Sequence, residues 1–329
     1  MGQAECPVGQ ENELASMADV LALIAPIFVL LAAGFAGVRT GFVPEHAVQA
    51  LGFFVLNFAL PALIVHALTQ QDLRETFNWS YVAAYAAGSL AVFAAVLLAS
   101  RALGRPLSQS AIAALGGSAS NSGFVGFPVA SLALGAPALT ALPLAMLVEN
   151  ILVIPLALAL AEMGTQAGQS PGAVLRATAR RLARTPLILA IAAGTLLSAT
   201  GLQLPRWLAM PLDMMADASV PCALFVVGGT LAGLRVASAA TDISLIVVGK
   251  LLLHPLAVAG AFALIGGVPP GLMAAGIILA GSPMLTIYPI LAARFGYDRA
   301  GAAALFFATA LSFVTLTVLL AIALPASGG

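Results

Sequence analysis

Long runs of apolar residues recur along nearly the whole chain, and they constrain its fold more than any other feature. Hydrophobic residues make up 61% of the 329 residues and charged residues only 8%, against roughly 25% charged in soluble domains. A helix needs about 20 apolar residues to cross a bilayer, and ten such segments can be counted, so an integral membrane protein is expected. The segments cover residues 18–38, 47–68, 80–101, 110–134, 139–163, 186–203, 207–230, 241–265, 271–294 and 300–325.

An all-α bundle is favoured over a barrel of alternating strands, because aromatic residues are few and Ala, Leu and Gly dominate. The formal net charge of zero gives no indication of nucleic-acid binding. Cys6 and Cys222 indicate neither a disulfide framework nor a metal cluster. Residues 1–17 are polar and lack the features of a signal peptide. They are interpreted as a disordered tail, or as an extension preceding a true start at Met17.

The ten segments divide into two related sets of five. The longest polar connection, residues 164–185, separates residues 18–163 from residues 186–325. Because each set has an odd number of segments, the second must enter the membrane in the opposite direction, which predicts an inverted repeat. Pro26, Gly34, Gly41 and Pro61 recur 160 residues later as Pro186, Gly194, Gly201 and Pro221, and Phe127-Pro128 recurs 161 residues later as Tyr288-Pro289.

The basic residues between the segments predict the orientation in the membrane. Loops that follow odd-numbered segments carry most of them, so by the positive-inside rule this side is cytoplasmic. Both termini are then extracytoplasmic, and a multi-pass protein of the inner cell membrane is expected. The arginines on the cytoplasmic side are Arg39, Arg101, Arg105, Arg176, Arg180, Arg181, Arg184, Arg235, Arg294 and Arg299, and those on the other side are Arg74 and Arg206.

A stretch rich in Gly, Ser and Asn, residues 116–128, interrupts the fourth apolar segment. Such residues make a poor continuous helix, and non-helical backbone persists in a membrane only where it is buried or lines a cavity. Asn121 is expected to cap a half-helix that begins at Ser122. A broken helix at mid-membrane depth is how many secondary transporters build a substrate site.

The ninth segment carries the matching interruption, residues 280–289. Ser282 followed by Pro283 predicts a helix start, with a capping oxygen and then a residue that needs no amide partner. Inverted repeats bring the two half-helix N-termini together near the midplane, where their positive ends suit a small anion such as a carboxylate. The substrate-binding residues predicted are Asn121, Ser122, Gly123, Ser282, Pro283, Thr286, Lys250 and Asn57, with Pro128 and Pro289 shaping the crossover.

Several ionisable side chains lie inside apolar segments, where each is costly and is taken as functional by default. Lys250 either holds a substrate carboxylate or pairs with Asp217 or Glu149. Burial favours the neutral form of a carboxylate, so Glu149 is the candidate for proton coupling. With Asn150 and neighbouring oxygens it would equally suit sodium. Asp217, like Asn57, either faces the substrate or bonds to backbone freed by a nearby proline.

The sequence resembles the auxin efflux carrier family in its prokaryotic branch. The resemblance covers nearly all of residues 18–325 and implies a fold similar to that of the sodium–bile acid symporters. Helices 1, 2, 6 and 7 would form a scaffold, and helices 3–5 and 8–10 a moving transport domain. Prokaryotic relatives are associated with dicarboxylates such as malate and malonate, and plant members with auxin. The motifs that carry the resemblance are Asn121-Ser-Gly-Phe-Val-Gly-Phe-Pro128, Asn57-Phe-Ala-Leu-Pro-Ala-Leu63, Val220-Pro-Cys-Ala-Leu-Phe-Val-Val-Gly228 and Lys250-Leu-Leu-Leu-His-Pro255.

The leading hypothesis is a secondary carrier that moves small organic anions by elevator-type alternating access, without catalysis and without an organic cofactor. A proton or sodium would be the coupling ion. The partners expected are the anion, the bilayer and a second copy of the chain packed through the scaffold helices. Two alternatives stay open at this point. One is a sodium-coupled symporter of a larger organic anion, and the other is an intramembrane serine hydrolase using Ser118 and His254.

Overall fold

The chain is built entirely from helices in the residues that the computed structural model describes, which are 17–69, 77–165, 184–202, 204–233 and 240–326. This confirms the expected all-helical class. The expected N-terminal tail, apart from Met17, and most of the linker at 164–185 lie outside the described residues. Six described stretches are long and apolar enough to cross a membrane: Glu45–Thr69, Trp79–Ala102, Ala136–Thr165, Arg206–Gly233, Thr241–Ile265 and Ala300–Ile322.

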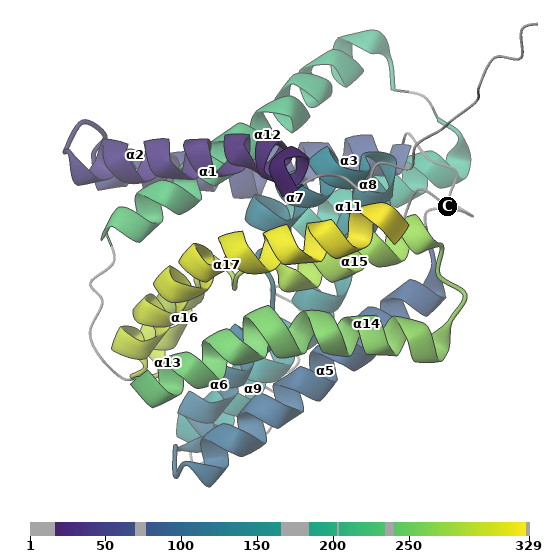
Figure 1. Cartoon of the computed structure of the whole chain (residues 1–329). Coiled ribbons are helices and arrows are strands. Elements are labelled where there is room, and N and C mark those ends of the chain that lie inside the picture. Colours follow the sequence, from purple (N-terminus) through teal and green to yellow (C-terminus); the bar gives the residue numbers. More distant parts are fainter. Residues whose placement is uncertain (1–16, 70–76, 166–183, 203, 234–239, 327–329) are drawn as a thin grey trace, which may run out of the picture.

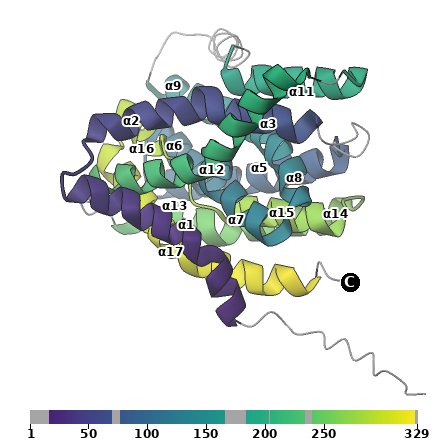
Figure 2. The same cartoon turned by 90° about the horizontal axis from the view of Figure 1, so that it is seen from above.

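One group of helices packs around α12, which lies along α1 and also contacts α2 and α3. Figure 2 shows α2 and α3 as one continuous rod, with α11 beside its α3 end. The α1–α12 contact is close because Gly34 and Gly228 have no side chain there. A Cβ on either would overlap the backbone carbonyl of Phe225 or Leu31. The group comprises α1 (Met17–Arg39), α2 (Glu45–Phe54), η1 (Val55–Ala59), α3 (Leu60–Thr69), α11 (Pro186–Thr200) and α12 (Arg206–Gly233).

The remaining helices form a second group, in which α14 packs on α5 and α15, α5 on α6, and α16 on α17. Figure 1 shows α5, α6, α9, α13 and α14 on the side of this group that lies away from α1 and α12. The group comprises α5 (Trp79–Ala102), α6 (Leu107–Ser118), η2 (Ser122–Gly126), α7 (Phe127–Leu134), α8 (Ala136–Val148), η3 (Glu149–Val153), α9 (Ile154–Thr165), α13 (Ala240–Val248), η4 (Gly249–Leu253), α14 (His254–Ile265), α15 (Pro270–Gly281), α16 (Tyr288–Arg294) and α17 (Asp298–Ala326).

Four helices each contain one five-residue π-turn, η1 to η4, and each turn ends two residues before a proline. Proline has no N–H, so a carbonyl one turn earlier loses its partner and the helix widens locally. The four prolines are Pro61, Pro128, Pro155 and Pro255. Such π-turns are frequent at functional sites, and these four carry or adjoin most of the predicted site residues.

Ion pairs join the two halves of the sequence at one end of the second group. Arg105 donates to Asp242 through Nε at 3.0 Å and Nη2 at 2.7 Å, and Arg294 pairs with Glu162. Asp242 is buried, so the bidentate arginine compensates a carboxylate that is otherwise costly to desolvate. These pairs fasten the segment before α6 to α13, and α9 to α16.

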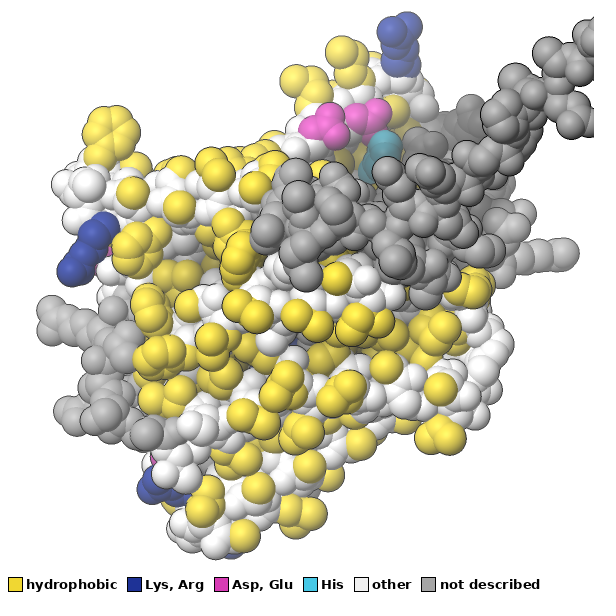
Figure 3. Space-filling model, viewed as in Figure 1, with side chains coloured by type: hydrophobic (Ala, Val, Ile, Leu, Met, Phe, Trp, Pro, Cys, Tyr) yellow, Lys and Arg dark blue, Asp and Glu magenta, His cyan; other side chains and the backbone are white. Residues whose placement is uncertain are grey.

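The molecular surface is mostly apolar on the face shown in Figure 3, with Lys and Arg side chains at its margins. Large hydrophobic side chains such as Leu256, Leu264 and Ile322 are strongly exposed in the isolated chain. Soluble monomers rarely expose contiguous apolar surface on this scale. The chain is therefore a multi-pass membrane protein whose apolar surface faces lipid.

Candidate functional site

A cavity of about 680 Å³ lies between the two groups of helices. One wall is a single face of the continuous α2–η1–α3 rod, and α11 and α12 extend it. The opposite wall comes from η2, η3 and the segment between α15 and α16. The polar residues that line the cavity, counted over both walls, are Gln49, Asn57, Asn121, Ser122, Glu149, Asn150, Thr230 and Thr286, together with Glu45, Ser120 and Thr185.

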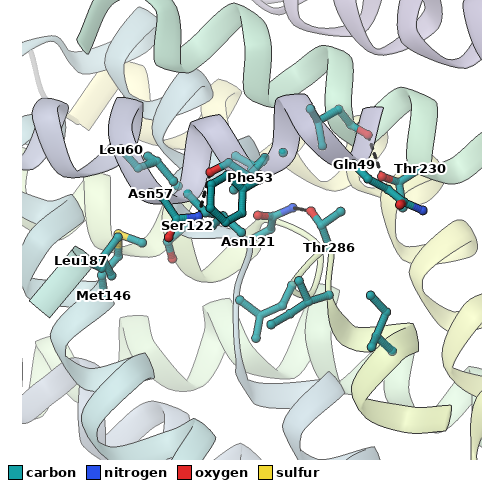
Figure 4. Close-up of a pocket in the computed structure, with 18 of the residues that line it drawn as sticks. Gln49, Phe53, Asn57, Leu60, Asn121, Ser122, Met146, Leu187, Thr230 and Thr286 are labelled. Carbon is teal, nitrogen blue, oxygen red and sulfur yellow. Dashed lines mark hydrogen bonds between the residues drawn. The ribbon is translucent and has the colours of Figure 1, made fainter. Parts of the chain in front are cut away.

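Asn121 ties together the two interruptions that face this cavity. The first is the extended segment between α6 and η2, and the second runs from Ser282 to Ile287 between α15 and α16. The backbone N–H of Asn121 donates to the Pro283 carbonyl at 2.7 Å, and its side-chain Nδ2 donates to Thr286 Oγ1 at 2.8 Å. Figure 4 shows this pair below Phe53 of the opposite wall. Two segments about 160 residues apart in sequence therefore meet at one point.

A helix begins at Ser122, directly beside the Asn121–Thr286 bond. The Asn121 carbonyl already accepts from Val125 and Gly126, so the N–H groups of the first turn, on Ser122 and Gly123, have no acceptor within the helix. These N–H groups and the positive end of η2–α7 are suited to an anion. The cavity thus carries neutral hydrogen-bond donors on a helix start.

Glycine allows the two interruptions to approach closely. A Cβ on Gly116 would lie 2.6 Å from the Tyr288 hydroxyl, and one on Gly126 would lie 2.9 Å from Leu279 Cδ2. Real Cβ atoms essentially never lie this close to another heavy atom, so a larger residue at either position would force its neighbour to shift. The glycine-rich composition of this segment is therefore a packing requirement as well as a helix breaker.

Glu149 lies at the edge of the cavity and is almost fully buried, with 1% of its surface exposed. Its Oε1 accepts from Ser122 Oγ at 2.8 Å, from the Tyr85 hydroxyl at 3.0 Å and from the Ser120 N–H at 3.3 Å. Of these donors, Ser120 belongs to the interruption before η2 and Ser122 is the first residue of η2. A change in the charge of Glu149 would therefore act directly on the segment that carries Asn121.

Lys250 lies behind the crossover rather than in the cavity lining. Its ammonium group donates to Ser120 Oγ at 2.6 Å, to the Ala280 carbonyl at 2.6 Å and to His254 Nδ1 at 2.7 Å. An ammonium group has three N–H donors, so all three are used. The Ala280 carbonyl belongs to the last turn of α15, where a cation is favourable. Lys250 therefore holds the end of one broken helix against the start of the other.

Ser120 connects the two buried charges. Its N–H donates to Glu149 and its Oγ accepts from Lys250, while among the described residues Glu149 and Lys250 form no ion pair within 4.0 Å. His254 completes the network through Ser89 Oγ, 2.9 Å from its Nε2. For Nδ1 to accept from Lys250, the proton of a neutral imidazole must be on Nε2.

Comparison with known proteins identifies the class to which this architecture belongs. The sequence model of the family described as "Membrane transport protein" matches residues 19–320. The chain belongs to this family, the auxin efflux carrier family. A putative malonate transporter of Rhizobium meliloti (strain 1021) is 29% identical over 306 residues, which cover 92% of this chain and 96% of that protein. The uncharacterized transporter YfdV of Escherichia coli (strain K12) is 27% identical over 241 residues, 71% of this chain and 75% of YfdV.

In this transporter the structure brings most of the predicted site residues together. Asn121, Ser122, Gly123, Thr286, Asn57, Glu149 and Asn150 all line the cavity. The side chains of Asn57 and Asn150 bond back to their own helices, at the carbonyls of Phe53 and Met146. These two asparagines therefore reach the cavity with part of their hydrogen-bonding capacity already used.

Other predicted residues lie outside the cavity lining. Pro128 and Pro289 are the second residues of α7 and α16, where a proline fits the start of a helix. Asp217 is exposed on α12. Ser118 Oγ donates to the Ala114 carbonyl, and His254 contacts Ser89, Ser120 and Lys250 instead. The imagined Ser118–His254 pair is not formed.

The predicted helix start at Ser122 is confirmed, whereas the start at Ser282-Pro283 and the side-chain cap by Asn121 were wrong. Ser282-Pro283 does not begin a helix, because Ser282 follows the last turn of α15 and its Oγ donates back to the Leu279 carbonyl. The next helix starts six residues later, at Tyr288. Asn121 precedes η2 but makes no side-chain cap, since its amide bonds across the crossover to Thr286. At Asn121 a long-range partner has replaced the local one, whereas Ser282 bonds back to the helix that precedes it.

Residues that the sequence interpretation missed are Tyr85, Ser120, Gln49 and Thr230. Tyr85 and Tyr81 are four residues apart in an alanine-rich helix and both are fully buried, and that spacing was the available signal for a buried hydroxyl. Ser120 adjoins Asn121 but was not distinguished from its neighbours. Gln49 and Thr230 come from α2 and α12, and nothing in their local sequence indicates that they line the same cavity (Figure 4).

Proposed function

We propose that this protein is a secondary active transporter of small organic carboxylates, with malonate and malate as candidate cargoes. The observation that carries the proposal is the crossover at Asn121, where a helix start and neutral donors meet at the cavity between the two helix groups. The name of the Rhizobium relative, a putative malonate transporter, supports a carboxylate as the cargo. Because the chain belongs to a transporter family, we propose no enzymatic activity for it.

We further propose an architecture of ten membrane-spanning segments in two inverted repeats. Two interrupted helices that cross near equivalent repeat positions support it, as does the recurrence of Pro26 and Gly34 as Pro186 and Gly194. The group around α12 would be the scaffold, and the second group would carry the site past it. The cavity between the two groups lies where an elevator movement requires a sliding interface.

The cavity is proposed to open to the cytoplasm. Its lining includes Glu45, Thr185 and Gly233, and these residues adjoin the arginine-bearing connections that follow the first, fifth and seventh segments. By the positive-inside rule those connections are cytoplasmic. The conformation described would then be an inward-facing one, in an inner membrane with both termini outside.

Proton coupling through Glu149 is the mode that we favour over sodium. Glu149 borders the cavity, and in the part of the chain that the structure describes its hydrogen-bond donors are the hydroxyl groups of Tyr85 and Ser122 and the backbone amide of Ser120. The Lys250 amino group of that network already occupies the acceptors of Ser120 and Ala280. Protonation of Glu149 would weaken its hold on Ser120 and Ser122 without adding an ion.

Uptake into proteoliposomes tests both parts of this proposal. Labelled malonate, malate and pyruvate would be offered to sealed vesicles, with proton and sodium gradients imposed separately. Saturable uptake that follows the proton gradient is expected. Uptake driven by sodium alone would retain the carrier and overturn proton coupling. If none of the three carboxylates is taken up, carboxylate transport is refuted.

A further inference from the structure

The two carboxyl oxygens of Glu149 have different surroundings. Oε1 accepts hydrogen bonds from Ser122 Oγ at 2.8 Å, from the Tyr85 hydroxyl at 3.0 Å and from the Ser120 N–H at 3.3 Å. Among the residues that the structure describes, no donor bonds to Oε2. A carboxylate oxygen has about two lone pairs, so Oε1 is saturated. A proton or a ligand can therefore bind only at Oε2.

Oε2 is also the oxygen of Glu149 that is exposed to the cavity. The buried side-chain atoms without a partner are, in the described ranges, Ser100 Oγ, Ser219 Oγ and the Tyr297 hydroxyl. Glu149 Oε2 is not one of these buried atoms although it has no partner, so the 1% of Glu149 that is exposed includes it. Because Glu149 lines the cavity, a ligand in the cavity reaches this atom.

Tyr85 holds the carboxyl group from the side of α5. Its ring is fully buried, stacks on Tyr81 with the ring centroids 5.8 Å apart, and makes an edge contact with His254 at 5.9 Å. Packing thus fixes the position of the Tyr85 hydroxyl. The other two donors, Ser120 and Ser122, approach from the crossover. With three donors on one side, a protonated carboxyl group turns its O–H towards the cavity, and Tyr85 is a positioning residue for that O–H.

No basic side chain in the described part of the chain compensates an ionised Glu149 directly. The titratable groups around it are Tyr81 and Tyr85 of α5, Lys250 of η4 and His254 of α14. The hydrogen bonds of the Lys250 amino group go to other residues. No ion pair within 4.0 Å joins it to Glu149. The charge of an ionised Glu149 is therefore felt in the cavity.

The protonation of Glu149 decides whether it repels or attracts an anion there. The charged side chains among the described lining residues, Glu45 and Glu149, are both acidic. A negative charge on Oε2 disfavours a carboxylate close to it. A protonated Oε2 is instead a hydroxyl donor, and a hydrogen bond from a hydroxyl to a carboxylate is roughly twice as strong as one between neutral groups. Proton binding at this one atom converts repulsion into attraction.

We propose that Glu149 binds the cargo directly, by donating the Oε2–H of its protonated carboxyl group to a carboxylate oxygen of the cargo. The proposal rests on the proposed function and deepens it, because it names the atom at which proton and cargo meet. A proton from the aqueous solution binds Oε2 before the cargo does and returns to solution after the cargo has left. One proton then crosses the membrane with each cargo. This contact is made from η3 and does not involve the N–H groups at the start of η2.

Exchange kinetics in proteoliposomes test this proposal. The KM for labelled malonate would be measured between about pH 6.5 and about pH 8.5, with the same pH on both sides of the membrane. Each pH unit above the ionisation of Glu149 lowers its protonated fraction about tenfold. The KM of the wild-type protein should therefore rise by at least about tenfold over this range.

Glu149→Gln is the decisive variant, because the same three donors select the orientation of its amide. Its carbonyl oxygen would accept from Tyr85, Ser120 and Ser122, so its NH₂ group would take the place of Oε2–H as a permanent donor. The KM of this variant should change by less than about twofold over the same range. Titration of malonate itself would affect both proteins equally, so the comparison controls for it.

Tyr85→Phe and Tyr81→Phe form a matched pair. Both tyrosines are fully buried and lie one turn apart on α5, but the Tyr81 hydroxyl donates to the Ala141 carbonyl at 3.4 Å and not to Glu149. The Tyr85 hydroxyl stabilises an ionised carboxylate more than a neutral acid. Tyr85→Phe should therefore move the rise in KM to higher pH by about half a unit or more. Tyr81→Phe should leave the rise in place.

The outcomes separate this proposal from the proposed function. A wild-type KM that rises no more than that of Glu149→Gln would overturn the proposal and leave a carboxylate carrier. A wild-type KM that falls with added sodium at constant pH would also overturn it, since Oε2 would then bind a cation. Identical pH profiles of Tyr85→Phe and Tyr81→Phe would refute the positioning role of Tyr85. If the wild-type protein exchanges no malonate, the proposed function fails and this proposal fails with it.

Discussion

Asn121 is the residue on which the site depends most directly. It is nearly buried, it lines the cavity, and its two hydrogen bonds join segments from both halves of the chain. If a side chain bonds only within its own helix, the helix keeps its shape when that bond is removed. The Asn121 amide differs, because its partner lies 165 residues away at Thr286.

Asn121→Ala should lower malonate uptake by at least about tenfold, since losing a hydrogen bond at a buried site costs about 1–2 kcal/mol and the anion also loses a donor. The backbone bond to Pro283 is retained, so the variant should fold. Asn57→Ala is the matched control, because Asn57 lines the same cavity but bonds to its own helix. Equal uptake by both variants would show that Asn121 matters no more for transport than Asn57.

Glu149→Gln tests whether the Glu149 carboxyl group couples proton movement to transport. Glutamine keeps the shape and the hydrogen bonds but cannot exchange a proton, so proton-driven accumulation should be lost while exchange of labelled for unlabelled substrate persists. Asp217→Asn serves as a control, because Asp217 is exposed on α12 and does not line the cavity. Coupling that survives in Glu149→Gln and disappears in Asp217→Asn would move the role to Asp217.

At the scale of elements, the approach of α1 to α12 depends on glycine. Gly228→Ala would place a methyl group on the Leu31 carbonyl, and overpacking of this kind costs about 1–3 kcal/mol. Its thermal unfolding temperature in detergent should fall. Gly260→Ala in α14 is the control, because nothing lies near the added Cβ and alanine favours a helix by about 0.5–1 kcal/mol. A stabilised Gly228→Ala would refute close packing of α1 on α12.

The sequence predicted which segments are helical and where two of them are broken, because apolar length and Gly-Ser-Asn composition are local signals. It did not predict that η1 to η4 are π-turns, although each precedes a proline such as Pro61 or Pro155. It also misplaced the helix start at Ser282-Pro283. Local capping rules cannot register a partner that arrives from the other half of the chain, as the Pro283 carbonyl shows by accepting from Asn121.

The same limit applied to the candidate site. Asn121, Ser122 and Glu149 could be identified because polar residues are costly in apolar segments. The Ser120 link between Glu149 and Lys250 could not, since it requires η3, η4 and the crossover to meet in three dimensions. Sequence composition indicated which polar groups are present, whereas packing decided that Lys250 belongs behind the crossover and not in the cavity.

At the scale of the whole molecule, a cavity lies between the two helix groups, and the crossover belongs to the second group. This arrangement fits a carrier that exposes one site to the two sides of the membrane in turn. A channel would need a continuous polar path, whereas the polar residues that line the cavity described here gather at the crossover and on the two helix groups beside it. A carrier of this kind must exchange its substrate across the membrane as well as bind it.

Counterflow tests that claim most directly. Vesicles loaded with excess unlabelled malonate would be diluted into trace labelled malonate without any imposed ion gradient. A carrier with one alternating site should accumulate label transiently above its equilibrium level, and Asn121→Ala should abolish the overshoot. Label that only rises monotonically to equilibrium in wild-type vesicles with saturable uptake would contradict alternating access at this crossover.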